Sequence, residues 1–189
     1  MANVNAPFGF RPIKVLGGGS PKPSGGYSIA SGYAANIFAG QPVERTGTGT
    51  NIQQAAAGNV NNIGVFQGCS YTDAQGKFKI SKYWPTGTVA TNIEAFVYDD
   101  PKIIYEVMCD TLAEADVSLL SDYDGVTGST VTGRSLASLA ASAAAATGQS
   151  FHIMRLSPRV GNAYGAYAIA EVVSAEHAYG TGAAGAGGV

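Results

Sequence analysis

Glycine is the residue that most constrains what this chain can fold into. The sequence holds 26 glycines among 189 residues, about twice the average frequency of roughly 7%. They are spread along the chain without a three-residue period, which excludes a collagen-like triple helix. Because glycine weakens helices and supplies the backbone conformations of tight turns, long helices are not expected. The pattern predicts a mainly β protein that is rich in turns.

The rest of the composition predicts a folded core and a surface short of charge. Hydrophobic residues make up 46% of the chain and charged residues 13%, against roughly 25% charged residues in ordinary soluble domains. So little charge is typical of a protein whose faces are covered by neighbouring subunits, and we expect a homo-oligomer. The formal net charge of −2 argues against nucleic acid as a partner. No apolar run is long enough for a membrane helix.

The first 26 residues are predicted to form an extended N-terminal arm. Four prolines and two glycine runs remove hydrogen-bond donors and raise backbone entropy, so neither a helix nor a central strand is expected. Two arrangements remain open for the apolar side chains of this segment. The arm lies across another surface, or it forms a short edge strand on its own domain. For the first arrangement, the candidate binding residues are Phe8, Phe10, Arg11 and Ile13.

Residues 27–179 are predicted to form one β domain, an antiparallel barrel or sandwich. Residues 63–69 fit a strand with a bulge or a close backbone approach at Gly64. Residues 73–76 (DAQG) indicate a hairpin turn. In residues 77–84, charged or hydroxyl side chains alternate with apolar ones, and this period of two predicts a half-buried strand. Further strands are expected at residues 89–98, 102–108, 151–156 and 167–173.

Helix is expected at two places at most. Residues 112–120 place apolar side chains at helical spacing after a possible cap at Thr111. Residues 135–146 contain four consecutive alanines but only two leucines for packing, so a short helix and an ordered loop remain open there. Residues 180–189 form a separate tail that is rich in glycine and alanine.

Charge is distributed unevenly along the chain. Up to Tyr98 there are seven basic and three acidic residues, whereas four basic and ten acidic residues follow. Most of these acids lie between residues 99 and 124. A solvated acidic face is the ordinary interpretation of such a run. The alternative is that subunits, or a subunit and a lattice, meet with the basic side of one against the acidic side of the other.

The sequence contains no complete catalytic or metal-binding motif, so no enzyme, cofactor or metal site is expected. Residues 122–125 (DYDG) resemble the start of a calcium loop but lack its later acidic ligands, so only a cation near Asp122 and Asp124 stays open. His152 and His177 are not accompanied by a nucleophile-elbow sequence and are expected to be strand-face side chains. The cysteine and histidine spacing is too long for a zinc site.

The N-terminus also bears on the two cysteines. Residues 1–7 (MANVNAP) have neither a basic region nor an apolar region, so no secretory signal is expected there. Without an oxidising compartment, a disulfide is the less favoured state. We therefore expect Cys69 and Cys109 to be reduced and partly buried thiols.

Several short segments resemble one family of virion proteins. The opening NAPFGFRP of residues 5–12 is similar to the N-terminus of small proteins encoded near the major capsid protein of tailed bacteriophages. The order of the later segments resembles that of the phage head decoration, or cement, proteins, although Ser118 stands where that pattern has glycine. These segments are YEVMCD (105–110), ADV (115–117), TGRS (132–135), FHIMRL (151–156) and AEV (170–172).

The resemblance implies a structural function. Such proteins are β-rich, assemble as homo-oligomers that are often trimers, and sit on the outside of the capsid shell, which they stabilise. It implies the major capsid protein as partner, the capsid surface of the virion as location, and no catalytic residues. Two alternatives stay open: another virion component such as a tail or head–tail part, and a host-surface carbohydrate-binding module that uses exposed tyrosine and tryptophan faces.

Overall fold

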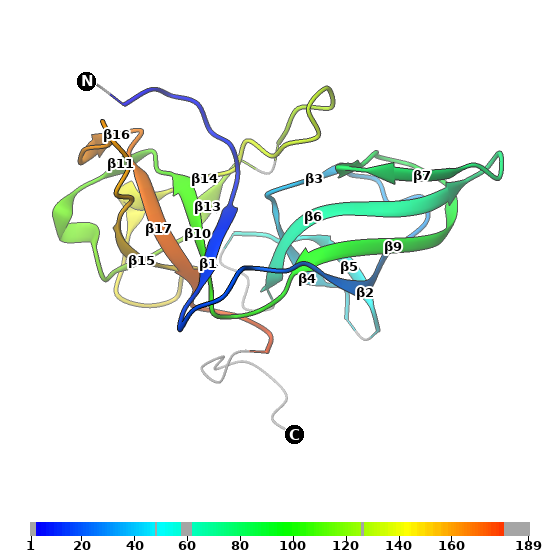
Figure 1. The fold of residues 1–189 in the computed structure, drawn as a ribbon, viewed down its shortest axis with the longest axis horizontal. Helices are drawn as coiled ribbons and strands as arrows, with labels where there is room; N and C mark the ends of the chain where they lie inside the picture. The colour runs from blue at the N-terminus through cyan, green and yellow to red at the C-terminus, as the bar shows by residue number, and fades with distance from the viewer. Residues whose placement is uncertain (1–2, 48, 58–61, 126, 180–189) are drawn as a thin grey trace.

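The chain folds into two lobes of β-structure that lie side by side along the long axis of the molecule (Figure 1). The computed structural model describes residues 3–47, 49–57, 62–125 and 127–179. One lobe, here the barrel lobe, is a continuous stretch from residue 24 to residue 98. The other, the terminal lobe, combines the N-terminal segment with residues 103–179. The prediction of a mainly β, mainly antiparallel fold is therefore confirmed, whereas the predicted tail at 180–189 lies outside the described residues.

The terminal lobe is built on a five-stranded antiparallel sheet in the order β1-β10-β17-β15-β12. Short two-stranded ladders, β11 with β16 and β13 with β14, cover its flanks. The strands are β1 (Arg11–Val15), β10 (Ile103–Met108), β11 (Thr111–Leu112), β12 (Leu120–Ser121), β13 (Tyr123–Asp124), β14 (Ser138–Leu139), β15 (Phe151–Leu156), β16 (Gly165–Ala166) and β17 (Ile169–Ser174).

The barrel lobe closes on itself through five strands. Neighbouring strands run in the order β4-β5-β2-β9-β6, and an additional pairing between β4 and β6 completes the ring. Closure leaves no free edge within the ring, but β7 pairs only with β6 and extends the sheet outward. The strands are β2 (Ser24–Ile29), β3 (Ile37–Phe38), β4 (Pro42–Arg45), β5 (Asn51–Gln54), β6 (Asn62–Asp73), β7 (Phe78–Ser81), β8 (Tyr83–Trp84) and β9 (Ala90–Tyr98).

A strand bulge and a hairpin turn in the barrel lobe occur where the sequence predicts them. Gly64 has φ +136°, and a Cβ atom there would lie 1.9 Å from the carbonyl oxygen of Tyr98, so only glycine fits. The β4–β6 register shifts beside this glycine, which confirms the predicted bulge and close approach. The hairpin turn after β6 is also confirmed, since the Asp73 carboxylate accepts hydrogen bonds from the backbone of Gln75 and Lys77.

Helix is almost absent from the described residues. The segment at 112–120 forms a single 3₁₀ turn, η1 (Glu114–Asp116), and the segment at 135–146 forms another, η2 (Ala141–Ala143). The expectation of at most a short helix there is confirmed, and no helix continues through Ser118 because this residue takes φ +75°, a left-handed conformation. Its backbone nitrogen instead donates to the carbonyl of Ile153 on β15. The glycine of the family pattern would adopt this conformation without strain.

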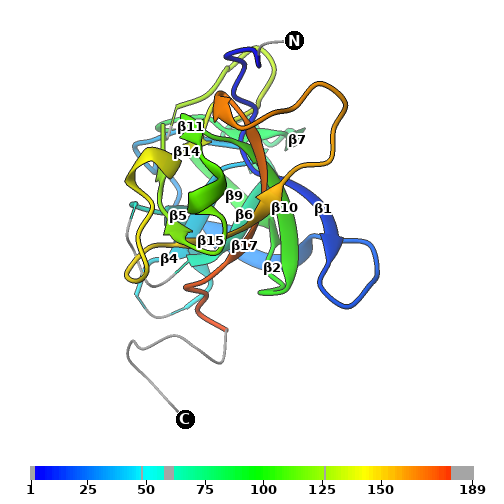
Figure 2. The same cartoon turned by 90° about the vertical axis from the view of Figure 1, so that its left-hand side faces the viewer.

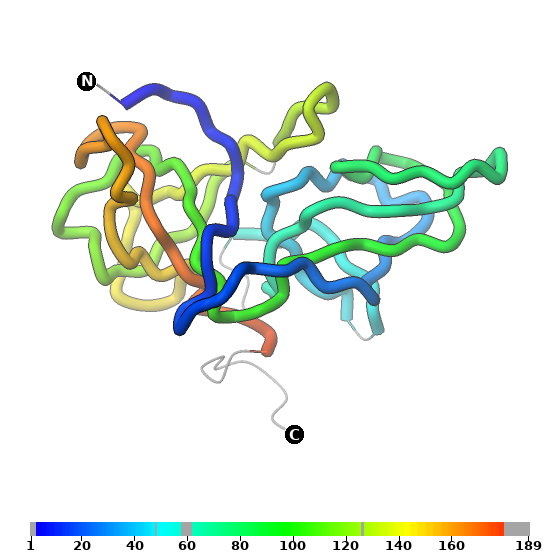
Figure 3. The backbone as a smooth tube through the Cα atoms, in the orientation of Figure 1, coloured from blue at the N-terminus to red at the C-terminus, as the bar shows by residue number. Residues whose placement is uncertain are grey.

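The N-terminal segment is part of the folded domain and is not a separate arm of 26 residues. β1 pairs with β10 at the edge of the terminal-lobe sheet, and β2 already belongs to the barrel. Figures 2 and 3 show β1 beside β10 before the chain crosses to the barrel lobe. Phe10 is 1% exposed and stacks on Phe151, with ring centroids 4.4 Å apart. The edge-strand alternative is confirmed, and the assignment of Phe10 as a docking residue is wrong.

Packing explains why Phe10 cannot be spared for a partner. Its ring also meets Tyr105 and Tyr123 edge-on, so it completes a cluster of four aromatic rings between the sheet and its flanking ladders. A second cluster of buried side chains fills the barrel and includes Trp84, which is fully buried. Each lobe therefore has its own core. No described helix is long and apolar enough to cross a membrane.

Candidate docking surfaces

Two buried carboxylates face each other on the terminal-lobe sheet. Glu106 on β10 lies directly opposite Glu171 on β17, and the two residues are 6% and 3% exposed. Adjacent buried like charges are unfavourable unless each has its own counter-ion. Glu106 pairs with Arg11 and accepts two hydrogen bonds from Arg159, at 3.0 and 2.8 Å.

The second carboxylate is satisfied in the same way. The Arg155 Nε donates a hydrogen bond to Glu171 at 2.9 Å, and its Nη2 forms an ion pair with the same oxygen at 2.8 Å. The Lys14 ammonium lies 3.5 Å from that oxygen. Ser157 adds a hydrogen bond to Glu106 at 2.6 Å. Arg11 and Lys14 come from the basic first half of the chain, so part of the charge imbalance in the sequence is neutralised within one molecule.

Of the four predicted binding residues, three are partly accessible and all lie on or beside β1. Phe8 is half-buried between two guanidinium groups, with Arg11 5.6 Å and Arg159 5.7 Å from its ring centroid. Ile13 is half-buried at the register shift of β1. Arg11 itself holds Glu106. The structure thus brings Phe8 and Arg11 together in one cation–π stack, in which both serve their own domain.

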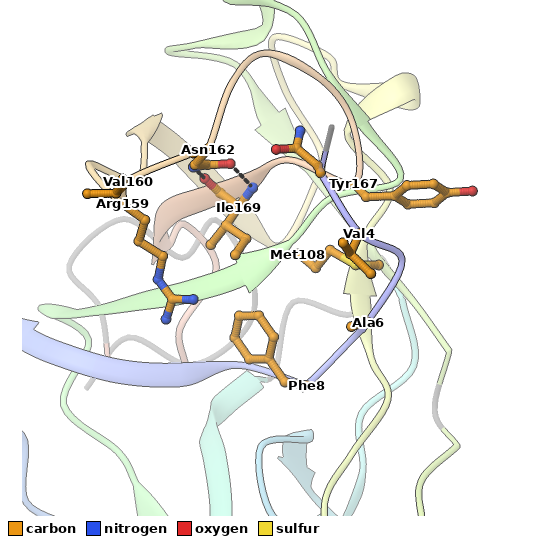
Figure 4. Close-up of a pocket in the computed structure, with 11 residues that line it drawn as sticks. Val4, Ala6, Phe8, Met108, Arg159, Val160, Asn162, Tyr167 and Ile169 are labelled. Atoms are coloured by element: carbon orange, nitrogen blue, oxygen red, sulfur yellow. Dashed lines mark hydrogen bonds between the residues drawn. The ribbon is translucent and has the colours of Figure 1, made fainter. Parts of the chain in front are cut away.

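A pocket of about 450 Å³ lies between the N-terminal segment and the loop that joins β15 to β17 (Figure 4). Asn3 anchors the N-terminal segment there by donating to the carbonyls of Ala163 and Ala166. The Asn162 amide is fully used by the backbone of Ser157 and Ile169. The walls are otherwise mostly apolar, and they include Val4, Ala6, Phe8, Met108, Val160, Tyr167 and Ile169.

The chemistry of this pocket favours an apolar group over a sugar. A carbohydrate site needs several free hydrogen-bonding groups around an aromatic face. Both asparagines that line the pocket already bond to the chain, and Arg159 is engaged by Glu106. Tyr167 offers an aromatic ring, but few free polar groups surround it. An apolar side chain of a protein partner fits better than a glycan.

The β6–β7 hairpin carries the most exposed pair of large apolar side chains on one strand. Phe78 is 66% exposed and Ile80 is 78% exposed, and the turn between β6 and β7 forms the far end of the barrel lobe (Figure 1). The predicted alternation is present, but the prediction of a half-buried strand is wrong. The apolar face of β7 points to solvent because this strand lies outside the closed ring. We call Phe78 and Ile80 the hairpin face.

Lysines flank the hairpin face. Lys77, Lys79 and Lys82 are all exposed. Lys79 pairs with Asp73 at 2.9 Å, and this contact raises the pKa of the lysine and lowers the pKa of the carboxyl. The hairpin therefore combines an apolar face with a positive rim.

The remaining residues that the sequence singled out serve the fold. Cys69 and Cys109 are free, buried thiols, and burial raises the pKa of each to about 12, so neither is a ready nucleophile. Asp122 accepts two hydrogen bonds from Ser150, and Asp124 accepts one from the backbone of Gly125. Among the described residues no group of acidic, histidine and cysteine side chains could hold a metal ion.

The two histidines lie in different surroundings. His177 is 2% exposed, and its Nδ1 accepts a hydrogen bond from the backbone of Tyr179. Burial lowers the pKa of this imidazole. His152 is half-buried on β15, opposite Leu120 of β12. Neither lies in the pocket beside the N-terminal segment.

Comparison with known proteins gives no independent assignment. No family model, no curated protein and no solved structure matches this chain significantly. The docking surfaces therefore rest on their own geometry. The alternation in residues 77–84 predicted the hairpin strand but placed its apolar face in a core. The signal for its exposure was the high density of lysines in the same strand, since three of eight residues from 77 to 84 are lysine.

Proposed function

We propose that this chain is a structural virion protein that binds the outside of a phage capsid shell and stabilises it, without a catalytic role. The single observation that carries the proposal is the hairpin face. Two large apolar side chains, Phe78 and Ile80, lie exposed on a strand that the barrel holds in place. Exposed apolar groups on a rigid element are typical of protein docking sites.

Energetics favour docking of many copies on a repeating surface. Full burial of one large apolar side chain contributes about 1.5–3 kcal/mol, so two such side chains provide a modest affinity. A capsid presents the same surface many times, and an oligomer that engages several sites gains by avidity. Any protein that binds the assembled shell and not its dissociated subunits stabilises the shell by mass action.

The other features support a protein partner on the capsid surface. The apolar pocket beside the N-terminal segment, lined by Phe8 and Met108 among others, suits a protein side chain. The resemblance of residues 5–12 and of the later segments to decoration proteins points the same way.

We also propose that copies associate as a homo-oligomer, with a trimer as the specific expectation. Sedimentation at micromolar concentration should then give a species of three times 19.2 kDa.

A binding experiment with purified shells tests the function. The protein is mixed with expanded capsid shells of the phage that encodes it, and we expect it to co-sediment with them and to raise the temperature at which they dissociate. Electron microscopy of the decorated particle should place it on the outer surface. Density at the tail or at the head–tail junction would instead assign another virion component. Glycan binding in the absence of shells would favour a carbohydrate-binding module.

A further inference from the structure

The backbone of β7 has one free edge. In the hairpin the backbone nitrogen of Asp73 donates to the carbonyl of Lys77, so the backbone N–H and C=O groups of Lys77 point toward β6. Backbone groups of an antiparallel strand point alternately to its two sides. The backbone groups of Lys79 and Ser81, which lie opposite Tyr71 and Cys69, therefore also point toward β6. The N–H and C=O groups of Phe78 and Ile80 point away from the sheet, where no described strand pairs with them.

The edge of the terminal-lobe sheet at β1 is protected against pairing. β1 contains Pro12, which has no N–H group, and its register shifts between Pro12 and Lys14. Proline and bulges are the usual devices that prevent strand addition at an edge. β7 has neither device within Phe78–Ser81. Its free backbone groups and its exposed apolar side chains belong to the same two residues, Phe78 and Ile80.

We infer that β7 accepts an extended strand of the shell protein as an additional strand of the sheet, one in which apolar and acidic residues alternate. The inference rests on the proposed function, because it names the part of the shell that docks. In an antiparallel pair, residues that lie opposite each other share one face. Apolar side chains of the added strand then cover the hairpin face, while acidic side chains meet Lys77 and Lys79 on the opposite face.

Charge identifies the occupant. Lys77 and Lys82 form no ion pair with any described residue, and Lys79 is shared with Asp73 alone. A second copy of β7 would place lysines beside lysines, and like charges at close range oppose pairing. An acidic strand neutralises the positive rim, so a partner strand is favoured over self-association.

Amide hydrogen exchange measured by NMR tests the inference directly. The probe is the peptide acetyl-Glu-Val-Glu-Val-Glu-Val-amide, added to the intact protein. The amides of Phe78 and Ile80 should exchange rapidly in the free protein and at least about tenfold more slowly with the probe bound. The amides of Lys79 and Ser81 should change little, since they already bond to β6. Unchanged exchange at Phe78 and Ile80 with millimolar probe would overturn the inference.

Two variants at one position separate strand addition from simple apolar contact. Ile80→Pro removes the outward N–H but keeps an apolar side chain, whereas Ile80→Thr keeps the N–H and loses apolar surface. Strand addition predicts that the proline variant binds the probe at least about tenfold more weakly than the threonine variant. The reverse order, or equal binding, would contradict it. Both variants should remain folded because the backbone at this position does not pair with β6.

The same variants on capsid shells keep the two proposals apart. Shells that take up the wild-type protein and Ile80→Pro equally well would support the docking function and overturn strand addition. Shells that take up no wild-type protein would overturn the function, while the peptide experiment still decides strand addition. If the amides of Phe78 and Ile80 exchange more slowly as the protein concentration rises, without probe or shell, the occupant is a second copy of the chain. That result would overturn the partner proposed above.

Discussion

Two edge strands of this molecule, β1 and β7, contain similar residues but place them in opposite environments. β1 and β7 are both short and both carry lysine or arginine; β1 follows Phe10 directly, and β7 begins with Phe78. At β1 the neighbouring phenylalanine, Phe10, is 1% exposed, and the cations pair with buried carboxylates. At β7, Phe78 is 66% exposed, and Lys79 is exposed and pairs with Asp73 in the adjoining turn. Similar composition thus builds a core edge in one lobe and an open edge in the other.

The difference lies in what each strand pairs with. β1 lies beside β10, whose six residues are all buried, so its neighbours are drawn into the core of the terminal lobe. β7 pairs only with residues 69–72 of β6, past residues 62–65, where β4 pairs with β6 and closes the ring. Topology, not composition, decides which apolar side chains are left for a partner.

The largest expected effect comes from the two phenylalanines. Phe10→Ala should lower the free energy of unfolding by about 3–5 kcal/mol, because it opens a cavity among four packed rings. Phe78→Ala should change it by about 0.5 kcal/mol or less, because the side chain is mostly exposed. Urea denaturation of both variants measures the difference. Equal losses would mean that β7 is as much part of the core as β1.

Deletion of the whole N-terminal segment is a stronger form of the Phe10 test. Removing residues 1–16 takes away both β1 and Phe10 and uncovers Glu106 and Glu171. Contrary to the expectation for a separate arm, the truncated chain should unfold or aggregate in isolation. A truncated protein with an unchanged melting temperature would restore the arm interpretation.

The ion pairs of the two edges should differ next most strongly. Glu106→Gln leaves Arg11 and Arg159 without their buried counter-charge, and we expect a loss of about 2 kcal/mol after allowance for the exposure of the arginines. Lys79→Ala removes an exposed lysine from its pair with Asp73 and should leave stability nearly unchanged. Thermal unfolding of both variants, in low and in high salt, provides the measurement. A similar loss for both would erase the distinction between the edges.

These contrasts also explain how far the sequence could be interpreted. Local signals placed the strand at residues 151–156 and the turn at residues 73–76, because side-chain alternation and turn residues act within a few positions. Alternation says which side chains share a face but not which face meets a core. For this reason the burial of Phe10 and the exposure of Ile80 were both predicted wrongly.

The rest of the candidate site depends on contacts between residues that are far apart in the sequence, and it could not be predicted from local patterns. The closing contact between β4 and β6, and the opposition of Glu106 and Glu171, join residues that no short pattern connects. Arg11 was singled out for docking because it lies near the N-terminus, yet its partner is 95 positions away. Only the composition of the hairpin, with its lysines, indicated that the strand after the turn is accessible.

The contact between the two lobes at residues 177–178, which we call the seam, should lose stability at acidic pH. His177 follows β17, is 2% exposed, and the next residue bonds to Asn62 of the barrel. Burial lowers the pKa of its imidazole, so the unfolded chain binds a proton more readily than the folded one. Stability should therefore fall as the pH drops below about 6.5.

Urea midpoints at neutral pH and at about pH 5 measure this effect. In His177→Asn the imidazole contribution should be absent, and the pH dependence should be weaker. Glu176 acts in the opposite direction, because burial raises the pKa of its carboxyl. Comparison of the variant with the wild type isolates the histidine. An unchanged pH dependence in the variant would show that the seam does not depend on His177.

The smallest expected effect concerns a turn in the terminal lobe. Ser118 holds φ +75°, which glycine adopts without strain. Ser118→Gly should raise the free energy of unfolding by about 0.5–1 kcal/mol. Ser118→Ala, which keeps the strain and loses the hydroxyl, is the matched control and should not stabilise the protein. Calorimetry of the two variants distinguishes a strained turn from an unstrained one.

The most direct measurement compares folding and docking in one variant. Phe78→Ser combined with Ile80→Ser removes the hairpin face without touching either core. The account predicts an unfolding transition close to that of the wild-type protein and an occupancy on purified capsid shells reduced at least about tenfold. Wild-type occupancy by this folded double variant would contradict the claim that β7 is the docking surface.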